Sequence, residues 1–290
     1  MACNNHIGIF GGDKRQVYMA SSMLSKGYYV YSYKLYEKIE HKNHTPVNDL
    51  KDLMNKCRVL IGPVPLTRDL VTISSGSSEN SSDKTIAHYL NKEHILIGGL
   101  IPPDLQKLCE EKGILCYDLM KSDKVAIMNA IATAEGAIME AIKNSDINLH
   151  KSNCLVIGYG RCGKVLATKL NGLDANVTVA ARSEDDLAYA QALGLSSVHI
   201  KDMAQILHTF QFIFNTVPAL ILDQDSLEKV SRDVVIIDIA SAPGGVDFEY
   251  AMKHGINAKL ILGIPGKVSP KTSAEILVTD IEALMKEVIV

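Results

Sequence analysis

The stretch that most constrains the fold is residues 154–163, which read CLVIGYGRCG. Cys154–Ile157 is an apolar run long enough for a buried parallel strand, and Lys164–Leu170 after the stretch has apolar positions on one helical face. Between them lie glycines with the spacing GxGxxG. A strand, a glycine turn and a helix in this order are typical of a dinucleotide-binding domain, although the same order also occurs in α/β turns that bind no ligand.

Each glycine of this motif has its own expected task. Gly158 permits the tight turn, Gly160 lets the backbone approach a pyrophosphate, and Gly163 lets the helix pack closely on the strand. The N-terminus of the helix offers unpaired N–H groups and the positive end of its dipole to phosphates. We therefore predict a dinucleotide site at this turn.

The next strand, Asn176–Ala180, ends where an NAD site usually carries an acidic residue for the ribose 2′-hydroxyl. This chain has Ala181, Arg182 and Ser183 there instead. A carboxylate would repel a 2′-phosphate, whereas an arginine and a hydroxyl would hold it. The sequence therefore favours NADP over NAD, unless Arg182 is an ordinary solvated loop residue.

The amino-acid composition limits which other classes of protein the chain can belong to. Of 290 residues, 47% are hydrophobic and 22% charged, with a net charge of −3, so a filled core is expected and nucleic acid or membrane is not expected as the main partner. We expect no signal peptide. The six cysteines are scattered, which predicts reduced thiols and no metal site. Cys162 starts a predicted helix, where the pKa of a thiol tends to fall.

Apolar runs and helical stretches alternate along the chain, which predicts an α/β fold with two doubly wound parallel-sheet domains. We expect an N-terminal substrate domain at 1–122, completed by a C-terminal helix at 272–290, a linking helix at 123–149, and a Rossmann NADP-binding domain at 150–271. Predicted strands are 6–10, 28–33, 59–61, 95–97, 114–117, 154–157, 176–180, 212–215, 234–238 and 259–262. Predicted helices include 47–57, capped by Asn48, and 102–112 and 123–144.

Polar residues inside this frame are candidates for the site. Asn129, Thr133 and Glu135 lie on the long apolar helix and face either a cleft or a buried environment in which they are satisfied. Three glycine- or proline-rich segments follow predicted strands, at 215–218, 238–245 and 263–272, where ligands of open α/β sheets bind. The serine-rich segment 74–83 is expected to be a mobile polar loop.

Several of these segments together resemble the A subunits of dipicolinate synthases. They are GGDKRQ at 11–16, GYGRCG at 158–163, ARS at 181–183, DIASAPGG at 238–245 and GKVSPKT at 266–272. The resemblance extends along almost the whole chain, and the first and last motifs are specific to that family. The chain departs from the family at Ser269, at Ser273 and in the segment 74–83. We carry over no function to the segment 74–83.

The resemblance implies a cytoplasmic oxidoreductase in the mother cell of a spore-forming bacterium. It implies a nicotinamide cofactor, a partner that is a flavoprotein-like B subunit, and a 4-hydroxy-tetrahydrodipicolinate or dihydrodipicolinate precursor that is oxidised to dipicolinate. It also implies an architecture similar to two-domain 2-hydroxyacid dehydrogenases, although their Arg-Glu-His arrangement is not visible here. A homo-oligomer is left open.

A dicarboxylate requires cations, and Arg15 could supply a bidentate contact and Lys267 a point charge. Both are expected in glycine-containing loops after strands of different domains, on opposite sides of a cleft. Asp13 and Glu135 are candidate proton acceptors, with no assignment between them. The remaining substrate-binding candidates are Gly12, Asn129, Thr133, Ser241 and Gly244. The cofactor-binding candidates are Gly158, Tyr159, Gly160, Arg161, Cys162, Gly163, Ala181, Arg182, Ser183, Thr216, Val217, Pro218, Ile239 and Ala240.

Two other functions remain compatible with the sequence. One is a different two-domain NADP-dependent oxidoreductase that acts on a small carboxylic acid, which the motifs at 11–16 and 266–272 disfavour. The other is a non-catalytic subunit that holds NADP while the B subunit supplies the chemistry.

Overall fold

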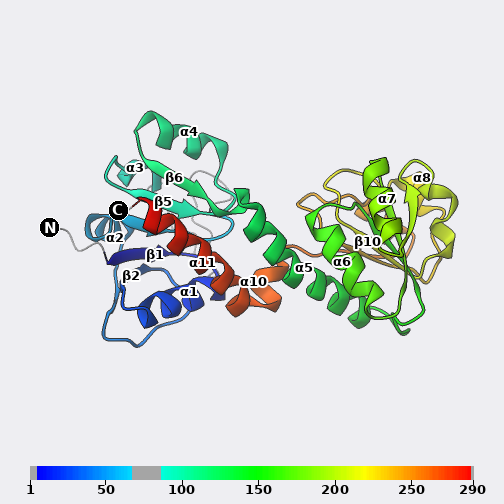
Figure 1. The fold of residues 1–290 in the computed structure, drawn as a ribbon, viewed down its shortest axis with the longest axis horizontal. Coiled ribbons are helices and arrows are strands. Elements are labelled where there is room, and N and C mark those ends of the chain that lie inside the picture. Colours follow the sequence, from blue (N-terminus) through cyan, green and yellow to red (C-terminus); the bar gives the residue numbers. More distant parts are fainter. Residues whose placement is uncertain (1–4, 67–85, 289–290) are drawn as a thin grey trace. The chain divides into compact units, whose positions relative to one another are not determined.

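The computed structural model describes residues 5–66 and 86–288, so the serine-rich segment 74–83 lies outside the described residues. The chain divides into two compact units (Figure 1). Unit 1 comprises Met1–Ala126 and Ser269–Val290, and unit 2 comprises Ile127–Val268. The division falls inside helix α5 (Asp123–Lys143), so this helix contributes to both units.

The described part of unit 1 contains a six-stranded parallel sheet in the order β3-β2-β1-β4-β5-β6. Strands β1 and β4 are parallel neighbours, but β2 and β3 lie on the far side of β1 and β5 and β6 on the far side of β4. The strand order therefore reverses between β1 and β4, which creates a switch point at their carboxyl ends. The strands are β1 (His6–Phe10), β2 (Tyr29–Tyr33), β3 (His44–Pro46), β4 (Val59–Ile61), β5 (Ile95–Gly98) and β6 (Leu115–Asp118).

Helices cover both faces of this sheet because successive strand residues point to opposite sides. Ile7 and Ile9 of β1 share a core with residues of α1 (Lys14–Ser25) and of the C-terminal helix α11 (Pro270–Val288). Phe10 belongs to the core on the other face, with residues of α2 (Leu50–Lys56), α3 (Ile86–Tyr89) and α4 (Pro103–Glu111). The short helix η1 (Leu119–Lys121) follows β6.

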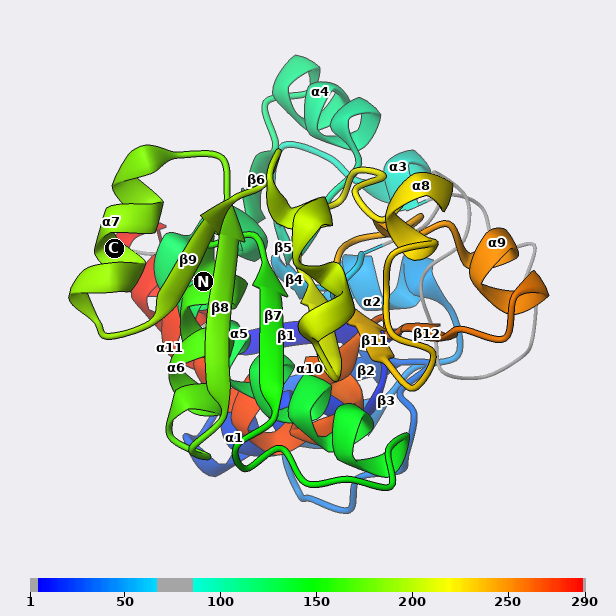
Figure 2. The same ribbon diagram turned by 90° about the vertical axis from the view of Figure 1, so that its right-hand side faces the viewer.

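Unit 2 has the same design, with a described six-stranded parallel sheet in the order β12-β11-β10-β7-β8-β9 (Figure 2). Its switch point lies between β7 and β10, where the strand order reverses. The strands are β7 (Asn153–Ile157), β8 (Asn176–Ala181), β9 (Ser196–His199), β10 (Phe212–Asn215), β11 (Val235–Asp238) and β12 (Asn257–Leu260). Two parallel sheets with helices on their faces confirm the predicted α/β class.

One core of unit 2 joins Cys154 and Val156 of β7 to α5, α6 (Arg161–Asn171) and α7 (Glu184–Ala192). The other core joins Leu155 and Ile157 to the short helices η2 (Met203–Gln205), η3 (Leu207–Thr209), α8 (Gln224–Leu227) and α9 (Phe248–Lys253). Both faces of β7 are therefore buried, as its apolar run predicts.

Helix α5 is long and apolar enough to cross a membrane by composition alone. Its alanines at 134, 137 and 141 are instead fully buried in the core of unit 2. A Cβ on its internal Gly136 would lie 2.2 Å from Cγ2 of Ile264 in α10 (Ile264–Val268). The glycine therefore allows α10 to pack directly against α5.

Three local predictions are wrong. Helix α2 begins after Asp49, whose side chain accepts a hydrogen bond from the N–H of Asp52 at 2.7 Å, and not after Asn48, because the preceding residues form β3. Strands β3 and β9 were not expected, since both are short and polar edge strands. The segment expected as a loop at 263–272 contains α10 and the start of α11.

Candidate functional site

The turn between β7 and α6 is shaped by two glycines that no other residue can replace without a shift. Gly158 has φ +92°, and a Cβ there would lie 2.4 Å from Oγ1 of Thr216. A Cβ on Gly163 would lie 2.1 Å from the carbonyl oxygen of Gly158. Helix α6 thus packs directly on the turn that precedes it.

Gly160 differs, because among the described residues no atom beyond its immediate neighbours in the chain lies within 4 Å of the place where its Cβ would be. It is the N-cap of α6, with extended backbone, and offers no side chain to the N–H groups of the first turn. The start of α6 is therefore open to an anion that binds backbone N–H groups. These residues fit the pyrophosphate of a dinucleotide.

The side chains between these glycines support the turn by packing. Tyr159 is 3% exposed in the core under α6, and its hydroxyl has no hydrogen-bond partner within the described residues. Burial raises the pKa of Tyr159. Burial also raises the pKa of the half-buried Cys162 thiol against the opposing effect of the exposed Arg161. Desolvation thus outweighs the tendency of a helix start to lower the pKa of this thiol.

The end of β8 presents the residues expected to contact the ribose. Ala181 is buried, whereas Arg182 is exposed and its guanidinium has no partner among the described residues. Ser183 caps α7, since its hydroxyl oxygen accepts a hydrogen bond from the N–H of Asp186 at 3.4 Å. The O–H of Ser183 remains able to donate to a ligand.

Sequence reasoning missed the charges that follow Arg182. The first turn of α7 carries Glu184, Asp185 and Asp186, which stabilise the positive end of the helix. Lys164 of α6 forms an ion pair with Asp186 at 3.1 Å. Two carboxylates remain close in sequence to Arg182 and oppose a phosphate there.

The loops after β10 and β11 complete this edge of unit 2. Thr216 is anchored to the end of β7, because its N–H and hydroxyl both donate to the carbonyl oxygen of Ile157 at 2.9 Å. Because the sheet is parallel, the carboxyl ends of its strands share one edge, and the candidates from four strands lie there. Of the remaining candidates, Val217 and Ile239 are half-buried, Ala240 and Gly244 are buried, and Pro218 and Ser241 are exposed.

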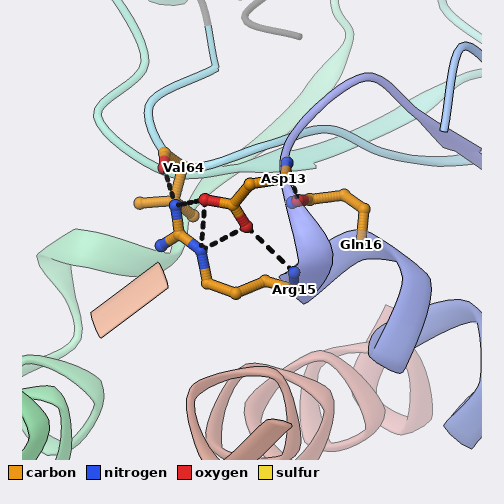
Figure 3. A network of polar contacts seen from close by, with 4 residues as sticks. All are labelled: Asp13, Arg15, Gln16 and Val64. Carbon is orange, nitrogen blue, oxygen red and sulfur yellow. Dashed lines mark hydrogen bonds and ion pairs between the residues drawn. The ribbon is translucent and has the colours of Figure 1, made fainter. Parts of the chain in front are cut away.

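In unit 1, the turn from β1 to α1 is a capping box (Figure 3). Asp13 accepts a hydrogen bond from the N–H of Arg15 at 2.9 Å, and its own N–H donates to Oε1 of Gln16 at 3.1 Å. Gly12 has φ +83°, and a Cβ there would meet the Gln16 side chain. The turn therefore lies tightly over the start of α1, with Nε2 of Gln16 buried and without a partner among the described residues.

The guanidinium of Arg15, a residue that is 8% exposed, is already bound (Figure 3). Its Nε lies 2.9 Å and its Nη2 2.8 Å from the carboxylate oxygens of Asp13, and Nη2 also donates to the carbonyl oxygen of Val64. The sequence led us to expect a guanidinium free to make a bidentate contact with the substrate. In the structure its Nε–Nη2 edge is already bound to Asp13. Only Nη1 has no hydrogen-bond partner among the described residues.

The candidates on α5 are engaged with neighbouring groups. The hydroxyl of Thr133 donates to the carbonyl oxygen of Asn129 at 3.0 Å, while Oδ1 of the buried Asn129 has no partner within the described residues. Glu135 accepts a hydrogen bond from Lys169 at 2.9 Å. Since Lys169 is about two helical turns along α6 from the glycine turn, this position does not favour Glu135 as the base.

Lys267 lies on the short helix α10 in unit 2 and is exposed, whereas the sequence suggested a loop. Arg15 belongs to unit 1. The sequence did not predict that the carbonyl oxygen of Val64 binds Arg15, because every residue has a carbonyl and its residue type gives no indication. By contrast, the spacing of Asp13 and Gln16 is a recognisable capping-box signal.

The glycine turn yields a prediction. Gly160→Ala should lower the melting temperature only slightly, because its Cβ meets open space and only the N-cap preference for glycine is lost. It should weaken dinucleotide binding by ~10-fold or more, because ligand fills that space. Gly163→Ala is the contrasting variant and should lower the melting temperature itself. Calorimetric titration and thermal unfolding of both variants check this, and full nucleotide affinity of Gly160→Ala would contradict it.

Two family models match the chain. Residues 6–120 match the N-terminal domain of the dipicolinate synthase A subunit, and residues 124–259 match the NAD-binding domain of D-isomer-specific 2-hydroxyacid dehydrogenases. The chain is thus an oxidoreductase with an NAD(P)-binding dehydrogenase domain, and the open cradle at Gly160 lies inside the second match.

Relatives that match over most of the chain or all of it agree. The dipicolinate synthase A subunit of Bacillus subtilis (strain 168) is 36% identical over 206 residues, which cover 71% of this chain and 68% of that protein. The crystal structure of the dipicolinate synthase A subunit from Bacillus halodurans has a TM-score of 0.90 at 30% identity, covering 98% of this chain and 99% of that one. The crystal structure of the Bacillus subtilis A subunit has a TM-score of 0.87 at 30% identity, covering 99% and 97%.

A transhydrogenase from Sinorhizobium meliloti shares only the fold, at 13% identity, with a TM-score of 0.67 and coverage of 96% of this chain and 94% of that one. The matches of both units and the extent of the whole-chain relatives lead to one conclusion. The chain belongs to the family of dipicolinate synthase A subunits.

Proposed function

We propose that this chain uses NADP to oxidise a dihydrodipicolinate or 4-hydroxy-tetrahydrodipicolinate precursor to dipicolinate during sporulation, in the cytoplasm of the mother cell. The observation that carries the proposal is the combination, in one chain, of the N-terminal domain typical of this family with a dehydrogenase domain whose glycine turn is open at Gly160. The domain limits proposed from the sequence, 1–122 with 272–290 for substrate and 150–271 for cofactor, belong to the same proposal.

The cofactor, when bound, accepts a hydride from the ring carbon that becomes aromatic. The 4-hydroxy precursor must also lose one water, and the ring gives up one proton for each hydride. The task of the chain is then to hold the ring beside the acceptor and to receive that proton. The N–H groups at the start of α6 hold the pyrophosphate, and the loops at 216–218 and 239–240 support the nicotinamide end.

Substrate binding is assigned to Arg15 with the backbone of Gly12, and Asn129, Thr133, Ser241, Gly244 and Lys267 are further candidates. Arg15 offers Nη1 to a carboxylate, unless the substrate displaces Asp13 from the Nε–Nη2 edge. The carboxylate of Asp13 is paired with Arg15 in the structure. Asp13 therefore becomes the better placed of the two candidate bases only if the substrate displaces it from Arg15.

A second function has a specific observation in its favour. Asp13 is paired with Arg15 and Glu135 with Lys169, so both candidate bases are occupied. This would suit a subunit that holds NADP while a flavoprotein-like B subunit performs the chemistry. Purified chain, precursor and NADP should nevertheless form NADPH and dipicolinate in equal amounts, measured by their absorbance. Product formation only after addition of the B subunit would support the second function instead.

Cofactor choice gives the next prediction. Arg182→Ala should weaken NADP binding by ~10- to 100-fold through loss of a charge-assisted phosphate contact, and leave NAD binding nearly unchanged. Glu184→Gln should change the NADP affinity in the opposite direction, because it removes a charge that repels phosphate. Calorimetric titration with each nucleotide measures the ratio. A ratio that Arg182→Ala does not change would remove the basis for NADP.

The carboxylate site is tested in the same way. Arg15→Ala should weaken dipicolinate binding by ~10-fold or more and leave NADP binding intact. Asp13→Asn should strengthen dipicolinate binding, because it keeps an N-cap side chain but releases the guanidinium. Lys14→Ala is the control, since Lys14 is exposed and its ion pair with Glu37 spans 3.4 Å. Lys267→Ala is titrated separately. Parent-like dipicolinate affinity in Arg15→Ala would place the substrate elsewhere.

A further inference from the structure

Two polar side chains are completely buried at the carboxyl edge of the unit 2 sheet. Asn215 ends β10, Asp238 ends β11, and the two residues are direct partners in the ladder. Both are 0% exposed. Nδ2 of Asn215 donates to Oδ1 of Asp238 at 3.0 Å. A buried carboxylate is costly unless its hydrogen bonds are satisfied, so its partners indicate what it stabilises.

The other partners of Asp238 are the backbone of the loop that follows it. The N–H of Ala240 donates to Oδ1 at 2.9 Å, and the N–H of Gly245 donates to Oδ2 at 2.6 Å. Within this loop, the N–H of Gly244 donates to the carbonyl oxygen of Ser241 at 2.9 Å. One carboxylate therefore holds both ends of the loop 240–245.

Asn215 holds the neighbouring loop in the same manner. Its Oδ1 accepts a hydrogen bond from the N–H of Val217 at 3.1 Å, and its Nδ2 also donates to the carbonyl oxygen of Val217 at 3.0 Å. The side-chain amide of Asn215 therefore makes its hydrogen bonds, as far as the structure describes them, to Val217 and Asp238. Any displacement of Asp238 is transmitted to the loop 216–219.

The two loops meet at Gly245. A Cβ there would lie 2.5 Å from the carbonyl oxygen of Ala219 and 2.6 Å from that of Val217. The carbonyl oxygen of Gly245 accepts hydrogen bonds from the N–H groups of Ile221 and Leu222, both at 2.9 Å. The spacing between the loops is therefore fixed by backbone contacts at Gly245, whose own N–H is bound by the Asp238 carboxylate.

We infer that Asp238, acting through Asn215, is a positioning residue that sets the spacing of the loops 216–219 and 240–245 and thereby holds the nicotinamide end of the cofactor site. It touches neither cofactor nor substrate. The inference rests on the proposed function, because the segments 216–218 and 239–240, which overlap these loops, are assigned to the nicotinamide end there.

The adenine end rests mainly on other contacts, although Val217, whose Cγ2 would lie 2.8 Å from a Cβ on Gly158, links it to the Asn215–Asp238 pair. The glycine turn depends on backbone contact between Gly158 and Gly163, and Arg182 follows β8. Thr216, which borders the turn, is held by two hydrogen bonds to Ile157 and none of the described hydrogen bonds joins it to Asp238. Loss of the Asp238 carboxylate should therefore affect the two ends of the same cofactor unequally.

Asp238→Asn tests this, because an amide offers one acceptor and one donor where two N–H groups require two acceptors. Two ligands are titrated, NADP and ADP-ribose 2′-phosphate, which lacks only the nicotinamide. NADP affinity should fall by ~10-fold or more, and ADP-ribose 2′-phosphate affinity should stay within about 2-fold of the parent. Asp247→Asn, which alters only the cap of α9 on the N–H of Tyr250, is the control and should change neither affinity.

Asn215→Ala is the second variant, and is used alone if Asp238→Asn does not fold. It leaves the Ala240 and Gly245 bonds in place and should weaken NADP selectively as well. Equal losses for both ligands, or no loss for either, would overturn the inference and leave the pair a support of the fold. Failure of the parent to bind either ligand, or their NAD counterparts, would overturn the proposed function, and this inference with it.

Discussion

The cofactor half of this protein depends on one close approach between backbones. The Gly163 position has no room for a Cβ, which would lie 2.1 Å from the carbonyl oxygen of Gly158. Because α6 can therefore start directly above β7, its N-terminus is directed to the carboxyl edge of the sheet. The open space at Gly160 lies at that N-terminus, and Thr216 after β10 borders the same turn.

The corresponding feature of unit 1 is a buried cation, the guanidinium of Arg15. Arg15 loses most of its contact with water, and Asp13 and the Val64 carbonyl replace it. The resulting pair stabilises the start of α1, yet it also occupies the edge of the guanidinium that suits a carboxylate. A ligand carboxylate must therefore compete with an internal one. Under the proposed function, such a competition would lower the affinity for the substrate carboxylate.

The sequence predicted what repeats regularly and missed what depends on neighbours. Buried central strands such as Cys154–Ile157 and the steric roles of Gly158 and Gly163 could be read directly, because apolar runs and backbone sterics are local. Edge strands β3 and β9 could not, since His-Thr-Pro and Ser-Ser-Val-His become strands only by pairing with β2 and β8. The Arg15–Asp13 pair depends on geometry in the same way, whereas the carboxylates of Glu184 and Asp185 follow Arg182 in the sequence and could have been weighed there. A residue type indicates a binding group, but only the fold shows whether it is free.

We propose that a dinucleotide lies across the carboxyl edge of the unit 2 sheet, and amide hydrogen exchange of the full chain, with and without saturating NADP, tests this. Exchange should slow at 158–164, 182–186, 216–219 and 240–245, and stay unchanged at the opposite, amino edge of the same sheet. Protection confined to the amino edge, or absent from the segments at 158–164 and 216–219, would contradict it.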